Sequence, residues 1–265
     1  MSMKDFSSNA VLIRKIEYGD YDYIITFFSE KTGKISVIAK NAKKSIRRFQ
    51  GSLDLFSLMN IQVMYPKKRK TALPVLFNVD LIDPYETIRT DVEKTGYASY
   101  WMEMINCYLE DQRAQLPLYK LVLVSLNALN KNLISKQIIN LLFQIRFMVF
   151  SGFAPDLKKC GICRMSIEDV QGHAGREKVI FDIKNGCFVC EQCKKRASAQ
   201  YIMISKGTLK QLAWINDNKI EKAGRIKFSS LAINEGEAFL QAFIPFHIGH
   251  DFKSLAFLQR IKETR

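Results

Sequence analysis

The sequence contains no run of about 18 uncharged apolar residues, the length that indicates a membrane-spanning helix. Its first residues, Met-Ser-Met-Lys-Asp, carry charges where a signal peptide needs an apolar run. It also lacks a G-x-x-x-x-G-K-[ST] phosphate loop, a G-x-S-x-G elbow, an H-E-x-x-H pair and the H-x-E element of zinc deaminases. These absences predict a cytoplasmic protein with no membrane partner and no catalytic residues, and they argue against an ATP-driven helicase.

Acidic residues are scarce: 26 Asp plus Glu face 40 Lys plus Arg, which leaves a formal net charge of +14. Such an excess favours a polyanionic partner, either nucleic acid or an anionic surface. Hydrophobic residues make up 48% of the chain and charged residues 25%, which excludes disordered and fibrous classes. The length of 265 residues fits one large domain or two to three small ones, at roughly 150 residues per domain.

Residues 10–82 consist of short alternating runs rich in Ile, Val, Phe and Tyr, separated by turn signals. The pattern predicts five strands: Ala10–Ile16, Asp22–Ser29, Lys34–Lys40, Leu53–Tyr65 and Thr71–Leu81. Five strands with a longer loop after the third match an OB-fold barrel, which holds single-stranded nucleic acid or oligosaccharide on its sheet face and loops. A small Sm-like or SH3-like barrel is the alternative.

Cations concentrate in two loops of this predicted barrel. Between residues 31 and 70 there are eleven Lys or Arg and a single acidic residue, Asp54. Because phosphates attract flexible cations and bases stack on exposed aromatic rings, we expect these loops to bind DNA, with Tyr21, Phe49 or Tyr65 offering a ring. The candidate DNA-binding residues are Lys34, Lys40, Lys43, Lys44, Arg47, Arg48, Lys67, Lys68, Arg69 and Lys70. The alternative is that the loops are merely solvated and the aromatic residues belong to the core.

Helical periodicity follows the barrel. Asp83 predicts a helix cap, with Pro84 at the first helical position and Glu86 three residues after the cap. The run Gln137–Phe150 is apolar almost all round, which predicts the central helix of a bundle. Further helices are expected from a capping box at Asn234–Glu237 and over Phe252–Ile261. Arg146 is expected to pair with a carboxylate or extend out of the bundle, and Cys107 to be a core residue.

Five of the six cysteines lie between residues 160 and 193. Cys160–Cys163 and Cys190–Cys193 form two C-x-x-C knuckles separated by 26 residues, and each can offer two thiolates to one tetrahedral zinc ion. Residues 181–189 predict a hairpin with an Asn-Gly turn that carries the second knuckle to the first. A site with four cysteines has no open coordination position, so Zn²⁺ there is expected to be structural. Cys187 and His173 are alternative ligands, and four reduced thiols or a disulfide are the alternative to a metal.

Several segments together resemble the RecO family of bacterial recombination mediators, and the resemblance covers nearly the whole chain. Gly19–Asp22, Phe28–Ile35 and Ala39–Lys43 are similar to the barrel signature of the family. Three further segments are similar to its junction before the cysteines, its second knuckle and its C-terminal helix, namely Ser151–Pro155, Gly186–Cys193 and Phe246–Ile261. Asn41 and Cys187 depart from the family, which usually has glycine at both positions. Asn tolerates the left-handed backbone that such a glycine adopts, and the second departure supports a spare thiol at Cys187.

The resemblance implies an α+β architecture: an OB-fold DNA-binding domain over residues 1–82, then a helical domain over 83–265 with a zinc-finger segment inserted at 157–197. It also implies a non-catalytic, nucleoid-associated protein of RecF-pathway DNA repair. Members of the family bind single- and double-stranded DNA, anneal complementary strands and bind RecR. They also help load RecA onto DNA coated by single-strand-binding protein, whose acidic C-terminal tail they contact.

Two other functions stay open from the residues alone. A metal-dependent nuclease with an OB targeting module would need several carboxylates converging on Mg²⁺, and Asp20, Asp22 and Glu30 are candidates near turns. An RNA-binding zinc-ribbon factor would use the same basic loops and cysteines.

Overall fold

The computed structural model describes residues 5–45, 48–49, 52–66, 73–170, 178–218, 222 and 228–263. The chain divides into two compact units. The first unit comprises Met1–Asn130 together with Ser254–Arg265, and the second comprises Lys131–Lys253. No helix among the described residues has both the length and the apolar character needed to cross a bilayer.

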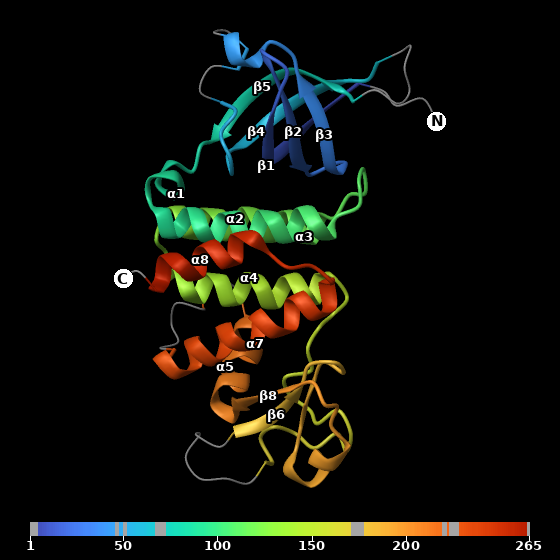
Figure 1. Cartoon of the computed structure of the whole chain (residues 1–265), viewed down its shortest axis with the longest axis vertical. Helices are drawn as coiled ribbons and strands as arrows, with labels where there is room; N and C mark the ends of the chain where they lie inside the picture. Colours follow the sequence, from blue (N-terminus) through green and yellow to red (C-terminus); the bar gives the residue numbers. More distant parts are fainter. Residues whose placement is uncertain are drawn as a thin grey trace. The chain divides into compact units, whose positions relative to one another are not determined.

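The first unit begins with a closed five-stranded barrel (Figure 1). Its strands are β1 (Phe6–Tyr18), β2 (Asp22–Ser29), β3 (Gly33–Ala39), β4 (Leu58–Met64) and β5 (Val75–Asp83). They pair in the order β1-β2-β3-β5-β4, and β4 returns to pair with β1. All pairs are antiparallel except β3 with β5, which meet in parallel at Ile38 and Val75. The prediction of a five-stranded barrel is confirmed.

Alternating side chains fill the barrel. Along β3 the residues alternate between buried and half-buried, and Ile35, Val37 and Ala39 face inward. They meet Ile25 and Phe27 of β2 in one apolar cluster. Because successive side chains of a strand point to opposite faces, this period of two is the signal that predicts the strand from the sequence.

The fourth strand begins later than predicted. Residues 53–57 form a turn rather than the start of the strand, and Phe56 has a φ of 73°. The Phe56 N–H donates to the Leu12 carbonyl (2.9 Å), and the Leu12 N–H donates to the Ser57 carbonyl (3.2 Å). The sequence predicted a strand here because the segment is rich in apolar residues. The left-handed backbone of Phe56, which is rare for a bulky residue, cannot be recognised from that pattern.

The first helix also begins later than predicted. Asp83 does not cap a helix, because its carboxylate accepts from the Tyr85 N–H (2.8 Å) within a turn. Helix α1 is short (Glu86–Thr90), and α2 (Val92–Tyr108) then starts after Asp91. The Asp91 carboxylate accepts from the N–H groups of Glu93 (2.9 Å) and Lys94 (3.0 Å), which makes it the true cap of the long helix.

Besides the short α1, three longer helices complete the first unit beside the barrel: α2, α3 (Leu116–Asn130) and α8 (Lys253–Glu263). Helix α2 crosses one end of the barrel (Figure 1). The ring of Phe28 in β2 meets the ring of Tyr119 in α3 edge to face, 5.5 Å between centroids. Helix α8 lies close on α2, since a Cβ at Gly96 would come 2.9 Å from Leu258 Cδ1. The Ser254 N–H donates to Glu103 (2.9 Å) at the start of α8.

The second unit is built on α4 (Lys136–Phe150), which is buried almost all round as predicted for a central helix. Helices α5 (Lys206–Asp217) and α7 (Ser230–Ile248) pack on it. The Arg146 guanidinium on α4 donates to the Ile215 carbonyl (3.1 Å) and to that of Asn218. It therefore neutralises the C-terminal carbonyls of α5, where a cation is favourable.

Helix α7 starts four residues before the predicted capping box. Ser229 caps it by accepting from the Ala232 N–H (3.1 Å), so Asn234–Glu237 lie inside the helix. Glu235 instead accepts from the Ser205 N–H (3.0 Å) and from the hydroxyls of Ser205 (2.5 Å) and Thr208 (2.6 Å). The capping-box prediction is wrong because Ser229 already caps the helix more than one turn earlier, and Glu235 fastens the start of another helix, α5.

A three-stranded sheet completes the second unit, in the order β7-β6-β8. Its strands are β6 (Lys178–Asp182), β7 (Cys187–Val189) and β8 (Tyr201–Ser205), and the 3-10 helix η2 (Glu191–Arg196) follows β7. The predicted hairpin is present, with Gly186 at a φ of 64° in its turn. We call residues 156–205 the cysteine segment.

Candidate metal centre and nucleic-acid interface

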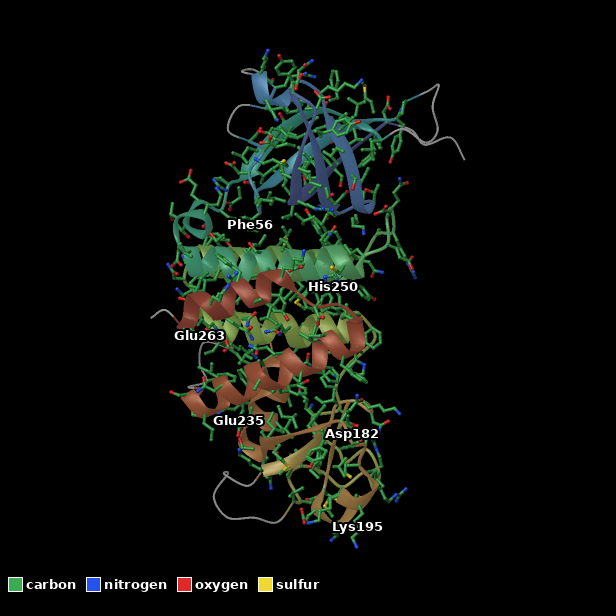
Figure 2. All side chains as sticks on the ribbon, viewed as in Figure 1. Phe56, Asp182, Lys195, Glu235, His250 and Glu263 are labelled. Atoms are coloured by element: carbon green, nitrogen blue, oxygen red, sulfur yellow. The ribbon has the colours of Figure 1, made fainter. Side chains whose placement is uncertain are left out.

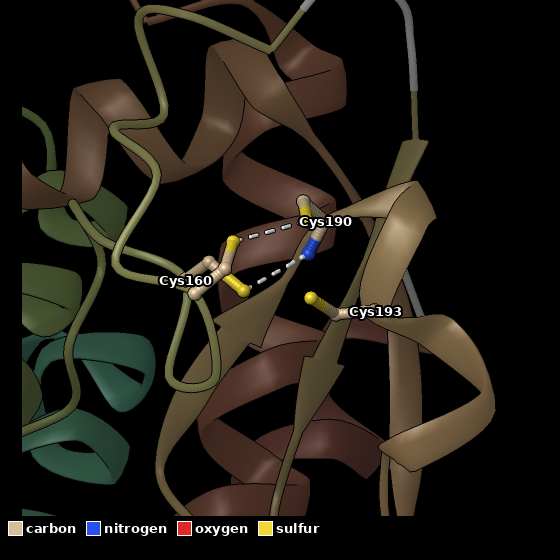
Figure 3. Close-up of side chains that lie close together, drawn as sticks. Cys160, Cys190 and Cys193 are labelled. Carbon is tan, nitrogen blue, oxygen red and sulfur yellow. Dashed lines mark hydrogen bonds between the residues drawn. The ribbon is translucent and has the colours of Figure 1, made fainter.

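The two predicted knuckles meet in the cysteine segment. The sulfurs of Cys160, Cys163, Cys190 and Cys193 all lie within 4.8 Å of one another, and Figure 3 shows three of these side chains turned toward a common point. Cys163 Sγ and Cys190 Sγ are 3.6 Å apart. A tetrahedral ion with bonds of about 2.3 Å separates its sulfurs by about 3.8 Å, whereas a disulfide joins them at about 2.05 Å. The donor set and its spacing therefore fit one zinc ion.

Backbone hydrogen bonds hold the knuckles in register. The Cys160 N–H donates to the Met165 carbonyl (2.9 Å), and the Cys193 N–H donates to the Cys190 carbonyl (2.9 Å), so each knuckle is closed by its own turn. The Gly161 N–H donates across to the Phe188 carbonyl of β7 (3.0 Å). The hairpin thus carries the second pair of thiols to the first pair, as the Asn-Gly turn predicted.

The four thiols differ in acidity. Burial raises the pKa of Cys160, but N–H groups of Cys163, Cys190 and Ile162 outweigh it and lower that pKa to about 6. Burial and then the hydrogen bond with the Cys163 thiol raise the pKa of Cys190, and burial and then the hydrogen bonds with the Cys190 and Cys163 thiols raise that of Cys193. One thiolate makes further ionisation costly, so four thiolates together require a cation at their centre.

Cys187 is not part of the converging group among the described residues. Its sulfur lies against Gly161, where an added Cβ would come 2.1 Å from Cys187 Sγ. This buried thiol therefore occupies space that only a glycine at position 161 leaves open. His173, the other alternative ligand, lies outside the described residues.

The candidate nucleic-acid interface is built around the tip of the β1–β2 hairpin. Asn41 has a left-handed backbone (φ 55°), as expected for an asparagine that replaces glycine. Its N–H donates to the Asp22 carboxylate (2.8 Å), and the Lys43 N–H donates to the Tyr21 carbonyl (3.0 Å). These bonds fix the 3-10 turn η1 (Ala42–Lys44) against the hairpin.

Cations and tyrosine rings stack on this tip. Lys44 Nζ lies 3.6 Å from the ring centroid of Tyr21, a side chain that is 43% exposed. Lys15 Nζ and Lys43 Nζ lie 5.3 and 5.6 Å from the ring centroid of Tyr23. We call these five residues the barrel-tip surface. Alternating cations and accessible rings are the combination that single-stranded nucleic acid uses for its phosphates and bases.

Two further predicted cations lie beside this surface. Lys40 is exposed, and its carbonyl accepts from the Arg48 guanidinium (3.2 Å), which also lies 4.9 Å from the ring centroid of Phe49. Phe49 itself is only 4% exposed and belongs to the barrel core, so its expected role as an accessible ring is wrong. Tyr65 is half-buried against the same core.

Lys34 is not brought together with the other candidates. It lies on β3 with a side chain that is 18% exposed, and its ammonium donates to the Asn106 carbonyl (3.1 Å) and pairs with Asp111 (3.4 Å). Lys34 therefore ties the barrel to the end of α2. Five other candidates lie outside the described residues, namely Arg47, Lys67, Lys68, Arg69 and Lys70.

Three residues at the barrel tip were not predicted from the sequence: Lys15, Tyr23 and Glu17. The Glu17 carboxylate accepts from Lys43 Nζ (2.9 Å), and this bond lowers the pKa of Glu17 and raises that of Lys43. The available signal was the repetition of tyrosine between residues 18 and 23, which is dense for a hairpin tip. The excess of positive charge instead predicted DNA binding by the loop after the third strand and by the loop between the fourth and fifth strands.

Two smaller expectations remain. Cys107, expected in the core, is exposed. Asp20, Asp22 and Glu30 do not converge as a nuclease site requires, because the four cysteines are the only group of potential metal ligands among the residues that the structure describes.

Comparisons with known proteins agree over the whole chain. Residues 3–85 match the family model described as Recombination protein O N terminal, and residues 89–256 match Recombination protein O C terminal. A DNA repair protein RecO from Desulfatibacillum aliphaticivorans is 38% identical over 260 residues, covering 98% of each chain. Proteins of the same name from Desulfosudis oleivorans and Syntrophus aciditrophicus are 34% and 28% identical, covering 98% and 95% of this chain and 99% and 94% of their own.

Proposed function

Because the chain belongs to the RecO family of DNA repair proteins, we propose that it is a non-catalytic recombination mediator acting at the nucleoid. It binds single- and double-stranded DNA, anneals complementary strands and helps load RecA onto strands coated by single-strand-binding protein. RecR and the acidic tail of the single-strand-binding protein are its proposed protein partners. The observation that carries the proposal is the barrel-tip surface, which combines cations with an accessible ring on a family-matched barrel.

The proposed DNA contacts follow from the chemistry of this tip. Lys44 and Lys43 neutralise phosphates of the strand, and Tyr21 offers its ring to a base. Lys40 and Arg48 extend the cationic surface beside them. None of these groups discriminates between base edges, so the binding is independent of DNA sequence.

The metal is proposed to be structural zinc. Cys160, Cys163, Cys190 and Cys193 would hold it, and a bound ion would supply folding free energy to the cysteine segment rather than Lewis-acid chemistry. With four protein sulfurs around the ion no position is left for a substrate.

Annealing of complementary strands coated by single-strand-binding protein tests the function directly. The assay contains no nucleotide, and a denaturing gel checks that the strands stay intact. Faster annealing with uncut strands is the expected result, since holding and pairing strands needs no hydrolysis. Cleavage of labelled DNA in Mg²⁺ or Mn²⁺ would instead favour the nuclease, and preference for RNA over DNA in competition would favour an RNA-binding factor.

A further inference from the structure

A cavity of about 350 Å³ opens in the cysteine segment beside the metal centre. Charged and polar side chains on its wall include Asp156, Arg164, Asp182, Asn185 and Arg196. Gly161 and Gly186 form another part of the wall. The cavity is separate from the barrel-tip surface, because every residue of its lining belongs to the second unit.

The two carboxylates of this wall are already satisfied from within the segment. Asp182 accepts from the N–H groups of Asn185 (3.0 Å) and Ser198 (2.7 Å) and from the Ser198 hydroxyl (2.6 Å). Asp156 accepts from the Lys159 N–H (2.9 Å) and from the Arg164 guanidinium (3.0 Å). Each carboxylate therefore repels an incoming anion less strongly, because its hydrogen-bond donors offset part of its negative charge.

Several cations of the cysteine segment have no acidic partner among the described residues, and one of them, Arg196, lines the cavity. Lys158 pairs with Asp217 (2.6 Å) and Lys194 pairs with Glu191. In contrast, Lys195 and Arg196 are exposed, and no carboxylate pairs with either among the described residues. The same holds for Lys159 and Lys184, and Figure 2 shows Lys195 extending outward from η2. We call these four cations, together with Arg164, which lies on the cavity wall and pairs with Asp156 (3.0 Å), the cysteine-segment cationic surface.

The metal knuckles fix the direction of these cations. Arg164 directly follows Cys163, and its N–H donates to the Cys160 carbonyl (3.0 Å). Lys195 and Arg196 follow Cys193 in η2, and the N–H of Ala197 closes that turn on the Lys194 carbonyl (3.1 Å). Each knuckle therefore places a guanidinium on the same cavity within three residues of a metal ligand. Guanidinium groups offer paired donors that match the oxygens of a phosphodiester.

We propose that the cysteine-segment cationic surface binds the phosphodiester backbone of a second DNA strand while the barrel-tip surface holds the first. This inference rests on the proposed function, since annealing requires that two strands meet on one protein. A single strand supplies repeated phosphates to the separated cations, and the cavity accepts one of its nucleotides between Arg164 and Arg196. The cavity wall carries only small or aliphatic apolar side chains, Ala154, Ile162 and Val189, and no ring.

The test uses the zinc-loaded full chain and two populations of oligothymidylate, one with a donor dye and one with an acceptor dye. These strands cannot pair with each other, so energy transfer reports only that the protein holds both. The double variant Lys195→Gln with Arg196→Gln is expected to abolish energy transfer while its binding of one oligothymidylate persists.

A matched control carries the same loss of charge elsewhere. Lys120 and Lys131 are exposed outside the cysteine segment, and Lys120→Gln with Lys131→Gln should leave energy transfer at the wild-type level. Zinc content and thermal unfolding of both variants verify that the fold is intact, since none of the four side chains makes a hydrogen bond or an ion pair among the described residues.

Two results would overturn the inference, and a third would overturn the proposed function on which it rests. Equal energy transfer in the wild type and the Lys195→Gln, Arg196→Gln variant would assign the second strand to another surface or to a second copy of the chain. If the double variant binds an oligoglutamate peptide more weakly than the wild type but shows unchanged energy transfer, the surface binds an acidic protein segment instead of a DNA strand. Failure of the wild type to bind even one strand would instead overturn the proposed function itself.

Discussion

At the scale of single residues, Tyr21 and Lys44 make separable contributions to DNA binding. Tyr21→Ala removes a stacking ring without changing charge, so single-strand binding should weaken by about 1–3 kcal/mol with an unchanged salt slope. Lys44→Gln removes a phosphate contact, so the slope should fall by about 0.7. Salt titrations of oligothymidylate binding distinguish the two effects. Identical slopes in Lys44→Gln and the wild type would remove Lys44 from the DNA site.

Glu17 competes with phosphate for Lys43. Their side chains pair at 2.9 Å at an exposed position, so a bound phosphate must replace this carboxylate. Glu17→Gln should therefore strengthen single-strand binding by about two- to fivefold at low salt, with the gain fading as salt rises. Glu110→Gln, which releases the exposed Arg113, is the matched control and should leave affinity unchanged. Weaker single-strand binding by Glu17→Gln would show that the ion pair holds Lys43 in place for the phosphate, rather than that Glu17 competes with the phosphate.

Gly161 and Cys187 are coupled through space. A methyl group at position 161 would overlap Cys187 Sγ, so Gly161→Ala should destabilise the protein by about 1–3 kcal/mol. Adding Cys187→Gly removes the overlapping sulfur and its Cβ, and should restore most of the loss. Denaturant unfolding of the two single variants and the double variant measures this coupling. Additive losses would show that the two positions act independently.

At the scale of the elements, Glu235 joins α7 to the start of α5. Its side chain is 11% exposed, and burial raises its pKa, but the hydroxyl and N–H donors of Ser205 and Thr208 outweigh burial and lower it below 4.5. Glu235→Gln should cost about 1.5–3 kcal/mol at neutral pH. A lowered pKa stabilises the fold above the unfolded value, so the gap between the two proteins should narrow as pH falls below about 4.5. Unfolding free energies of the wild type and Glu235→Gln at pH 7 and pH 4 check this. A difference between the two proteins that does not change with pH would exclude the charge of Glu235 as the cause.

The elements also show what the sequence could predict. The period of two along β3 and the nearly continuous apolar run of α4 each report which faces are buried, so both elements were predicted closely. Asp83 and Asn234 carry the correct local chemistry for helix caps, yet Tyr85 turns left-handed and Glu235 bonds to a distant Ser205. Cap signals fail here because a local turn takes the Asp83 carboxylate and because Ser229 supplies the cap of α7 more than one turn before Asn234.

The candidate sites divide in the same way. The two C-x-x-C knuckles identified all four converging cysteines, because the metal imposes a spacing that the sequence displays. The DNA interface was found only in part, since charge counting cannot tell Lys34, which is engaged beside α2, from Lys44, which stacks on an exposed ring. Burial of Phe49 was equally hidden, because a loop aromatic residue can fold back into the barrel.

At the scale of the whole molecule, metal removal should affect the two units unequally. A strong chelator withdraws the cation that four close thiolates require, so β6–β8 and their connections should lose structure. The barrel core contains no metal ligand and should keep its fold and its single-strand binding. Metal analysis should find one zinc per chain, and proteolysis after chelation should cut first within residues 156–205. Protein purified without chelator that contains no zinc would contradict the structural metal.

The predicted division at residues 82 and 83 remains a prediction about evolutionary domains, whereas the compact units follow another boundary. Helices α1, α2 and α3 group with the barrel, and α8 joins them. The first unit therefore consists of two stretches of chain that are separated by the entire second unit.

This return of α8 to α2 sets an order on biosynthesis. A ribosome that has made the barrel and the first three helices has not yet made Leu258, the side chain that packs against Gly96. The second unit is continuous in sequence and emerges complete before that contact can form. During translation the face of α2 around Gly96 stays exposed until α8 has been made. The contact between Gly96 and Leu258 is therefore among the last that the chain can form.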